Sequence, residues 1–380
     1  MHTNFIDLSA TLHNEYLLKT EALFVTQKKR WFGTFLDHFQ SICTEITKLQ
    51  KEASIPAISR MEYTMFYTNF IKRRYVAEIW VYGDKRYLDK EQRMVGEYDI
   101  SFLFVYFDEL WNKLLSSRKY YVGKVTAQEI KAIVMQALPD YYSYFINIVR
   151  FAIVDFIDKK LSMDFVTDEL FKVNVGDYMA KTEPVFIKRK RNKDANTLVK
   201  WFEERLENMY SFEDYSTLDF SRHSFTHSEF RYSHFCNSCL INTSFKGSVL
   251  IGASFYKARM ENCCLDNCSL YEVNFSYAIL RNASFVMVRG RSGLPDEEEW
   301  WHVGFLPVNF HNADLTNANF TGANLAGADF NGAILTGVNF VGANLANVDF
   351  TGATLTDADF TDAVLDNAIY GGDYLVFKDE

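Results

Sequence analysis

Cysteine and histidine side chains gather in one stretch of the chain, and zinc coordination is the chemistry they could perform. Cys236 and Cys239 form a CxxC pair, and the same stretch contains further ligand-type residues, namely His223, His227, His234, Cys263, Cys264 and Cys268. Zinc needs four such ligands that converge as a tetrahedron. A five-residue period, described below, points Cys263 and Cys268 inward and the other cysteines outward on different faces. We therefore predict no metal site and no cofactor.

Other catalytic motifs are sparse. The sequence contains neither GxGxxG nor GxxxxGK(S/T), so it has no glycine-rich phosphate cradle. Ser116 to Lys119 spell SxxK, the short nucleophile motif of some penicillin-binding enzymes, but the match stands alone. We predict that the protein is not an enzyme. An effector activity in residues 1–193 remains the alternative.

Two sets of residues are of the kinds that bind partner proteins. Arg289, Arg291, Trp300 and Trp301 lie in the segment 286–304, and tryptophan and arginine are favoured interface anchors. We predict a partner-binding loop there, with a variable surface loop as the alternative. The second set is a candidate acidic surface made of Asp329, Asp349, Asp357, Asp359 and Asp362. Its alternative is an ordinary solvated surface.

A strict repeat must position these side chains. Every fifth residue from Phe220 to Phe285 and from Phe305 to Tyr370 is large and apolar, which gives 14 plus 14, or 28, units. The unit is A-(D/N)-(L/F)-T-G. A period of five places successive centres about 140° apart on an α-helix and on alternate sides of a strand, so neither element buries them together. A chain that turns every five residues points the centre and the small residue two before it inward.

The repeat resembles the pentapeptide-repeat family. The resemblance implies a right-handed quadrilateral β-helix with four units, or twenty residues, per coil. Residues 211–370 would then form about seven coils, a rod about 34 Å long. Residues twenty apart should stack. Phe310, Phe330, Phe350 and Tyr370 form one expected column, and Phe320, Phe340 and Phe360 form another on the opposite side.

The ends and the interruption of the repeat need their own explanation. Open coils require caps, and we assign residues 194–210 to a linker and capping helix and residues 371–380 to a C-terminal cap or tail. The register of five survives across 286–304. The simplest arrangement places Phe305 on the face after Phe285, with fifteen residues extruded as a loop.

The sequence of residues 1–193 predicts a mainly helical α+β domain, and we recognise no family in it. The apolar spacing favours a helix over 28–51, and residues 99–117 also favour a helix. A strand pair is expected at 63–67 and 75–82. Thr126 and Glu129 form a capping box that opens a helix at 127–137. Pro139 would start a further, centrally buried helix that ends at Lys160.

Composition and charge limit the function classes. The 380 residues carry a net charge of −9, which disfavours a strongly basic nucleic-acid binder. Ser211 to Glu380 hold 21 acidic and 9 basic residues, a net of −12, and the rest of the chain is +3. The most apolar stretch, 141–157, is broken by Arg150 and Asp155, and no signal peptide is evident. Six cysteines fit a reducing compartment. We expect a cytoplasmic protein with no membrane span.

These observations favour a non-enzymatic interaction protein, whose acidic rod and loop bind a partner protein without binding nucleic acid directly. The alternative comes from the resemblance. The bacterial antibiotic-resistance branch of the family consists of acidic β-helices, often dimers, that protect DNA gyrase or a related topoisomerase from quinolones or toxins by mimicking DNA. A homodimer is therefore a further expectation. This chain departs from that branch in its large N-terminal domain and in lacking an obvious C-terminal dimer helix.

Overall fold

The chain forms two compact units, Met1–Lys190 and Arg191–Glu380. Their boundary lies three residues before the predicted one. The computed structural model describes residues 3–83, 92–158, 163–177, 182–189, 210–292 and 305–371. The predicted capping helix, 194–210, lies outside these residues except for Tyr210. The predicted C-terminal tail, 371–380, lies outside them except for Gly371.

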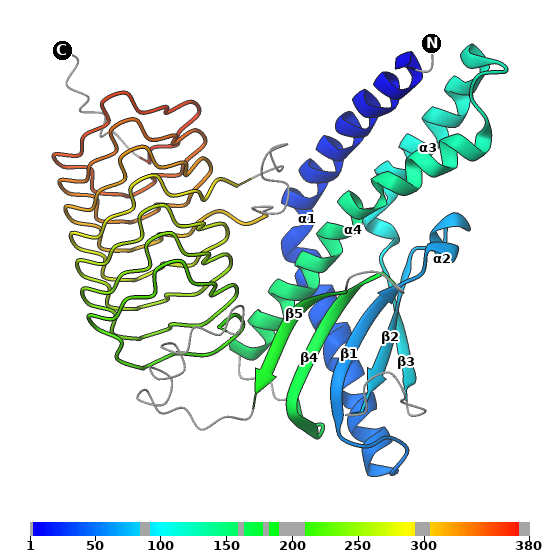
Figure 1. The fold of residues 1–380 in the computed structure, drawn as a ribbon, viewed down its shortest axis with the longest axis horizontal. Helices are drawn as coiled ribbons and strands as arrows, with labels where there is room; N and C mark the ends of the chain where they lie inside the picture. Colours follow the sequence, from blue (N-terminus) through cyan, green and yellow to red (C-terminus); the bar gives the residue numbers. More distant parts are fainter. Residues whose placement is uncertain are drawn as a thin grey trace. The chain divides into compact units, whose positions relative to one another are not determined.

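The first unit combines helices with one five-stranded sheet (Figure 1). Its elements in chain order are α1 (Thr3–Lys51), β1 (Ile58–Met65), α2 (Tyr67–Ile71), β2 (Val76–Tyr82), β3 (Arg93–Asp99), a 3-10 turn (Ser101–Leu103), α3 (Val105–Ser117), a second 3-10 turn (Arg118–Tyr121), α4 (Ala127–Asp158), β4 (Thr167–Asp177) and β5 (Thr182–Arg189). The strand order is β3-β2-β1-β4-β5, with β1 and β4 parallel and the other neighbours antiparallel.

Aromatic side chains join the helices to one face of the sheet. Tyr63 of β1 is fully buried, and its ring contacts Phe35 of α1 at 5.3 Å and Phe145 of α4 at 6.0 Å. Tyr98 of β3 stacks on Phe145 at 5.8 Å. Alternation along β1 and β2 thus turns one row of side chains toward α1 and α4, which form the core of this unit.

Several predictions for this unit are confirmed and several are wrong. The antiparallel pair β1–β2 and the capping box are present, and in the box the Glu129 carboxylate accepts the Thr126 N–H at 2.7 Å. The helix predicted at 28–51 begins at Thr3 instead. The break predicted at Pro139 is absent, because α4 runs through it. Burial of Leu138, Tyr141 and Tyr144 outweighs the cost of an internal proline, about 3 kcal/mol.

The second unit is a stack of coils joined by parallel bridges between residues twenty apart (Figure 1). Each centre N–H from Tyr215 to Phe350 donates to the carbonyl of the wall residue one coil further on, as in Phe310 to Asp329 at 2.7 Å. Four walls result, named by their centres: wall I (Tyr215, Phe235, Phe255, Phe275, Phe310, Phe330, Phe350, Tyr370), wall II (Phe220, Leu240, Met260, Leu280, Leu315, Leu335, Leu355), wall III (Phe225, Phe245, Leu265, Phe285, Phe320, Phe340, Phe360) and wall IV (Phe230, Leu250, Leu270, Gly290, Leu325, Leu345, Leu365). The number of coils and their hand stay predictions.

The predicted aromatic columns are confirmed and extend across the interruption. All consecutive rings of wall I stack, with centroids 4.7 to 5.5 Å apart. Wall III stacks from Phe285 through Phe320 and Phe340 to Phe360. Rings of opposite walls meet edge to face in the core, as Phe310 and Phe320 do at 5.7 Å.

The predicted position of the loop is wrong at its start. Residues 286–292 continue the coil, because Arg289 bridges both Ser269 and Asn324. Gly290, not Phe305, occupies the place after Phe285. A Cβ there would lie 2.6 Å from Val308 Cγ2 and 3.3 Å from Leu270 Cβ, so neighbouring side chains fill the space of this centre. The offset between stacked residues rises from 20 to 35 across the interruption, as in Asn274 and Asn309, which confirms an insertion of fifteen residues.

We predict that Phe330→Ala destabilises the repeat unit by about 3–5 kcal/mol, because Phe330 is fully buried between stacked rings. Phe360→Ala is the matched control, since Phe360 belongs to the last coil and is only partly buried. It should cost less than half as much. Guanidinium unfolding measures both, and equal losses would contradict the role of the ladder.

Candidate functional site

The cysteines occupy the positions that the repeat predicts. Cys263 and Cys268 are buried, and their thiols donate to the carbonyls of Leu240 and Phe245 at 2.7 and 2.9 Å. Burial raises the pKa of both thiols to about 12, so they stay protonated. Cys239 bridges Arg259 rather than another cysteine. In the described part of the chain no three histidine, cysteine or carboxylate side chains are placed to hold a metal ion.

One cavity of the first unit is lined by a serine and a histidine, and the histidine pairs with an aspartate. It has a volume of about 210 Å³ between α1, α3 and α4, and Ser9 and His13 line it. His13 Nε2 lies 3.1 Å from a carboxylate oxygen of Asp140. However, Ser9 Oγ donates to the Ile6 carbonyl at 2.7 Å, which is the usual bond of a serine inside a helix. The arrangement therefore does not activate Ser9 as a nucleophile.

The isolated SxxK motif is structural as well. Ser116 is the last residue but one of α3, and its hydroxyl donates to the Lys113 carbonyl at 2.8 Å. Lys119 lies in the following 3-10 turn, where its ammonium packs 5.0 Å from the Tyr120 ring. Among the described residues, no hydrogen bond joins the two side chains. None of the helices in the described ranges combines the length and the apolar composition needed to cross a bilayer.

The predicted acidic residues are held by the backbone in two ways. Asp329, Asp349 and Asp359 lie on wall positions, where each Oδ1 accepts the N–H two residues later at 2.8 to 2.9 Å. Hydrogen bonds from the Thr361 hydroxyl and N–H lower the pKa of Asp359. Asp357 and Asp362 lie at the turns with φ of +56° and +57°. Asparagine performs both roles elsewhere in the rod, as Asn339 and Asn347 do.

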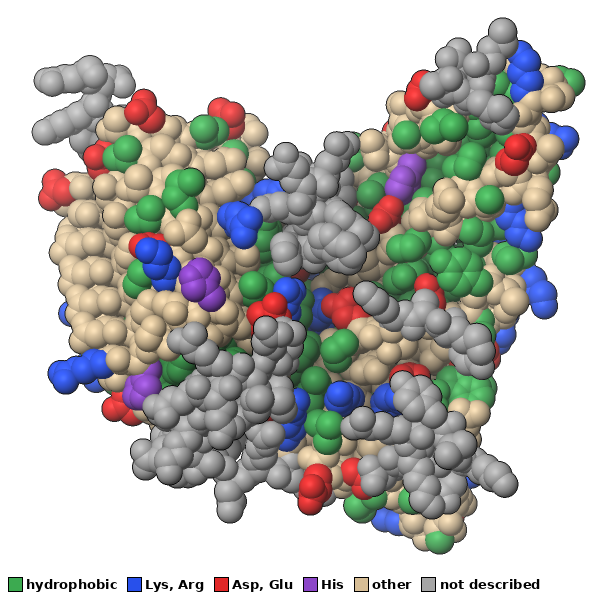
Figure 2. All heavy atoms as spheres, viewed as in Figure 1, with side chains coloured by type: hydrophobic (Ala, Val, Ile, Leu, Met, Phe, Trp, Pro, Cys, Tyr) green, Lys and Arg blue, Asp and Glu red, His purple; other side chains and the backbone are tan. Residues whose placement is uncertain are grey.

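The structure divides these residues between opposite walls. Asp329 and Asp349 bridge each other on wall I. Asp359 lies on wall III, and Asp357 and Asp362 lie at the two turns that flank it. Residues 305–371 nevertheless contain seven aspartates and no lysine or arginine. Figure 2 shows acidic side chains gathered toward the C-terminal end of the coils on the face in view.

The predicted loop residues are only partly described. Arg289 is exposed on wall IV, and its guanidinium reaches Ser269 Oγ at 3.4 Å. Arg291 lies at the next turn, just before the insertion. Trp300 and Trp301 lie outside the described residues. Glu272, which precedes the insertion, holds the chain where it returns. Its carboxylate accepts the Phe305 N–H at 2.9 Å.

Sequence reasoning missed a contrast at the second turn position of the units, two residues after each centre. The backbone there adopts a positive φ, which costs a residue other than glycine, asparagine or aspartate about 1 kcal/mol. After the insertion all twelve such positions, 312 to 367, hold one of those three residues. Before it nine of the sixteen positions, 212 to 287, do not: Phe212, Thr217, Arg222, His227, Tyr232, Lys257, Glu272, Tyr277 and Met287. Departures from the consensus could have revealed them.

Two family models match the second unit. Residues 303–371 match a pentapeptide repeat region, and residues 228–267 match pentapeptide repeats in eight copies. Neither match includes residues 268–292, where the structure continues the same ladder. No curated protein matches the sequence.

Solved structures similar to the chain are repeat proteins. QnrB1, a plasmid-mediated fluoroquinolone resistance protein, is 17% identical over 42% of this chain and 81% of that one, with a TM-score of 0.24. HetL, involved in heterocyst differentiation regulation in the cyanobacterium Nostoc, is 17% identical over 46% and 98%, with a TM-score of 0.13. A thylakoid-lumen protein of Arabidopsis thaliana is 26% identical over 34% and 66%, with a TM-score of 0.15.

We predict that Asp177 makes the stability of the first unit depend on pH. It is buried at the end of β4, and burial raises its pKa to about 6, although a hydrogen bond from Tyr142 opposes the shift. A folded-state pKa above the unfolded one gives stability that is present at low pH and is lost as the pH rises through about 6.

The test is urea unfolding of the wild type and Asp177→Asn at about pH 4 and about pH 7. The wild type should lose on the order of 2 kcal/mol more than the variant between these values. Parallel pH profiles for the two proteins would contradict this assignment.

Proposed function

We propose, from the premise that the C-terminal unit of this chain belongs to the pentapeptide-repeat family, that the protein is a non-enzymatic interaction protein. Its repeat unit would bind a partner protein through the acidic surface of the coils after the insertion. The first unit would accompany this binding module without catalysing a reaction. A stack of coils suits the role, because its core packing and its backbone hydrogen bonds are made within the stack. Its outward side chains can therefore vary without loss of the fold.

The observation that carries the proposal is the negative charge of residues 305–371, which hold seven aspartates and no lysine or arginine; only Asp314 is paired with an arginine of an earlier coil, Arg281. The bonds to backbone N–H groups hold Asp329, Asp349 and Asp359 in fixed positions. Fixed charges of one sign create a field that steers an oppositely charged partner toward the surface. A basic protein surface is the complementary partner.

The insertion supplies the second contact in this proposal. Arg291 marks where the insertion leaves the coil, and Glu272 holds the chain where it returns at Phe305. Trp300 and Trp301 belong to the inserted segment, and tryptophan is enriched among residues that dominate binding energy. We assign these two tryptophans and Arg291 to partner contact. Arg289 is at most a neighbour of that contact, because it belongs to wall IV.

DNA mimicry toward gyrase or another topoisomerase is the second candidate. The specific observation in its favour is the position of the carboxylates on two opposite walls of the same coils, with Asp349 on wall I and Asp359 on wall III. Phosphates likewise surround a duplex on more than one side. In this case the partner is the DNA-binding surface of the enzyme, and the protein would protect it from quinolones.

The charge proposal is tested by changing all five candidate residues, Asp329, Asp349, Asp357, Asp359 and Asp362, to asparagine. This removes five charges and keeps the turns, because asparagine already fills the same two roles in neighbouring units. Quantitative affinity capture from cells should recover a partner with the wild type and lose at least about nine-tenths of it with the variant. Asp219→Asn, the same wall-position change in the first coils, is the matched control.

The outcomes separate the two candidates. A gyrase supercoiling assay with a quinolone should show protection by the wild type, but not by the five-asparagine variant, if the protein mimics DNA. No effect on gyrase combined with charge-dependent capture of another protein supports the first candidate. Equal capture by wild type and variant would contradict both.

A further inference from the structure

The bulky positive-φ side chains of the first coils make different contacts. Several contact their own rod. Phe212 and Tyr232 pack ring on ring at 5.2 Å, and Tyr232 covers Gly252, where an added Cβ would lie 2.1 Å from its ring. Met287 covers Gly322 in the same way, and Glu272 holds Phe305. Lys257 and Tyr277 follow each other in one column, where both remain exposed and both contact the ring of Tyr256.

Around Lys257 and Tyr277 a small aromatic cluster lines the turns between walls I and II. The Tyr277 ring lies 5.8 Å from Tyr256 and 5.7 Å from His311, edge to face in both cases. The Lys257 ammonium lies 5.1 Å from the Tyr256 ring and 5.9 Å from the Tyr277 ring. Tyr277 keeps 46% of its surface exposed. Within the described residues no carboxylate pairs with Lys257, so its charge faces solvent.

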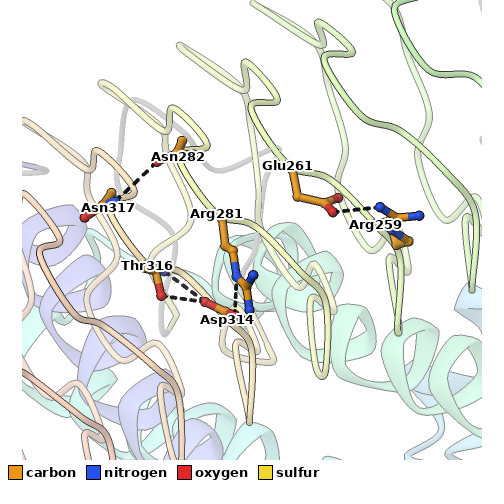
Figure 3. A network of polar contacts seen from close by, with 7 residues as sticks. All are labelled: Arg259, Glu261, Arg281, Asn282, Asp314, Thr316 and Asn317. Atoms are coloured by element: carbon orange, nitrogen blue, oxygen red, sulfur yellow. Dashed lines mark hydrogen bonds and ion pairs between the residues drawn. The ribbon is translucent and has the colours of Figure 1, made fainter.

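The adjoining part of wall II adds cations whose charge is already balanced. Arg259 and Arg281 are exposed, but Arg259 pairs with Glu261 at 3.0 Å and Arg281 pairs with Asp314 at 2.6 Å (Figure 3). Ile279 lies between Arg259 and Asp314 in the column of bridged residues on this wall, and Arg281 follows at the next turn. A carboxylate beside each arginine would repel a phosphate backbone. Tyrosine and arginine, which surround Lys257 here, are instead enriched in protein interfaces.

We propose that Tyr256, Lys257, Tyr277, His311 and Ile279 form a second docking surface, which binds a protein segment whose carboxylates alternate with apolar side chains. A carboxylate of the segment pairs with Lys257, and its apolar side chains pack on the exposed tyrosine and on Ile279. Apart from His311, the surface lies on coils before the insertion, and it has the opposite charge preference to the acidic surface. The chain keeps Lys257 and Tyr277 at strained backbone positions because they make these contacts.

The column itself offers substitutions that separate binding from folding. Asn237 and Asn312 occupy the same turn position one coil before Lys257 and one coil after Tyr277, both with positive φ. Lys257→Asn and Tyr277→Asn should therefore leave the thermal midpoint of the full-length protein unchanged or raised. The probe is a fluorescent twelve-residue peptide in which glutamate alternates with tyrosine and leucine, followed by anisotropy.

We expect the wild type to bind the peptide and each variant to bind about tenfold more weakly. Met287→Asn is the matched control. It changes an exposed positive-φ residue at the turn between walls III and IV, diagonally across the rod, and should leave peptide affinity unchanged. Oligo(dT) of twelve nucleotides is the second probe, and it should bind more weakly than the peptide.

Several results would overturn the proposal. One is that both variants bind the peptide as tightly as the wild type does. Another is that the wild type does not bind the peptide at about 1 mM. A third is that the wild type binds the oligonucleotide more tightly than the peptide. A lower thermal midpoint in Lys257→Asn or Tyr277→Asn would also overturn it, since the side chains would then serve packing.

Discussion

The hydrogen bond between each centre N–H and the wall carbonyl one coil further on is the constraint on which the repeat unit depends. It recurs at 2.6 to 2.9 Å from Tyr215 to Phe350 and fixes every inward residue against its equivalent one coil away. The aromatic columns follow from it, because the ladder places rings at equivalent positions of successive coils directly above one another. The outward side chains take no part in the ladder. The unit can therefore change its surface without changing its fold.

This separation explains why the two halves of the repeat differ. In the coils after the insertion, the second turn position of every unit holds glycine, asparagine or aspartate, the residues that tolerate a positive φ. The surface of these coils is acidic. The coils before it accept lysine, tyrosine and other bulky residues at the same strained angle. Strain that persists in a regular structure points to the side chains that require it. The two proposed surfaces have opposite charge preferences and share one ladder, which would suit a protein that brings partners together.

The sequence predicted the parts of the rod that follow from its period. The stacking of Phe310 on Phe330 and the inward thiol of Cys263 needed only the register of five. The insertion was misplaced by one unit because Gly290 does not resemble a centre, and only Val308 and Leu270 packing around it reveals that it is one. The Lys257–Tyr277 cluster was missed because turn residues carry no periodic apolar signal.

In the first unit, local signals succeeded where they were strong. The Thr126–Glu129 capping box marks the start of α4. Pro139 misled because tertiary burial overrides local propensity. Strands β4 and β5 were missed, since β4 pairs in parallel with β1 across more than a hundred residues and no short-range pattern records that pairing. The carboxylate of Asp177 is likewise buried by distant elements.

Amide hydrogen exchange across the insertion tests the central claim, that one continuous ladder supports both surfaces. The N–H groups of Phe275, Leu280 and Phe285 bond to carbonyls beyond the insertion at 2.7 Å each. We predict that they exchange as slowly as those of Phe310, Leu315 and Phe320, which bond within uninterrupted coils at 2.7 to 2.9 Å. Exchange of Phe275, Leu280 and Phe285 at rates typical of exposed turns would show two separate stacks and contradict the account.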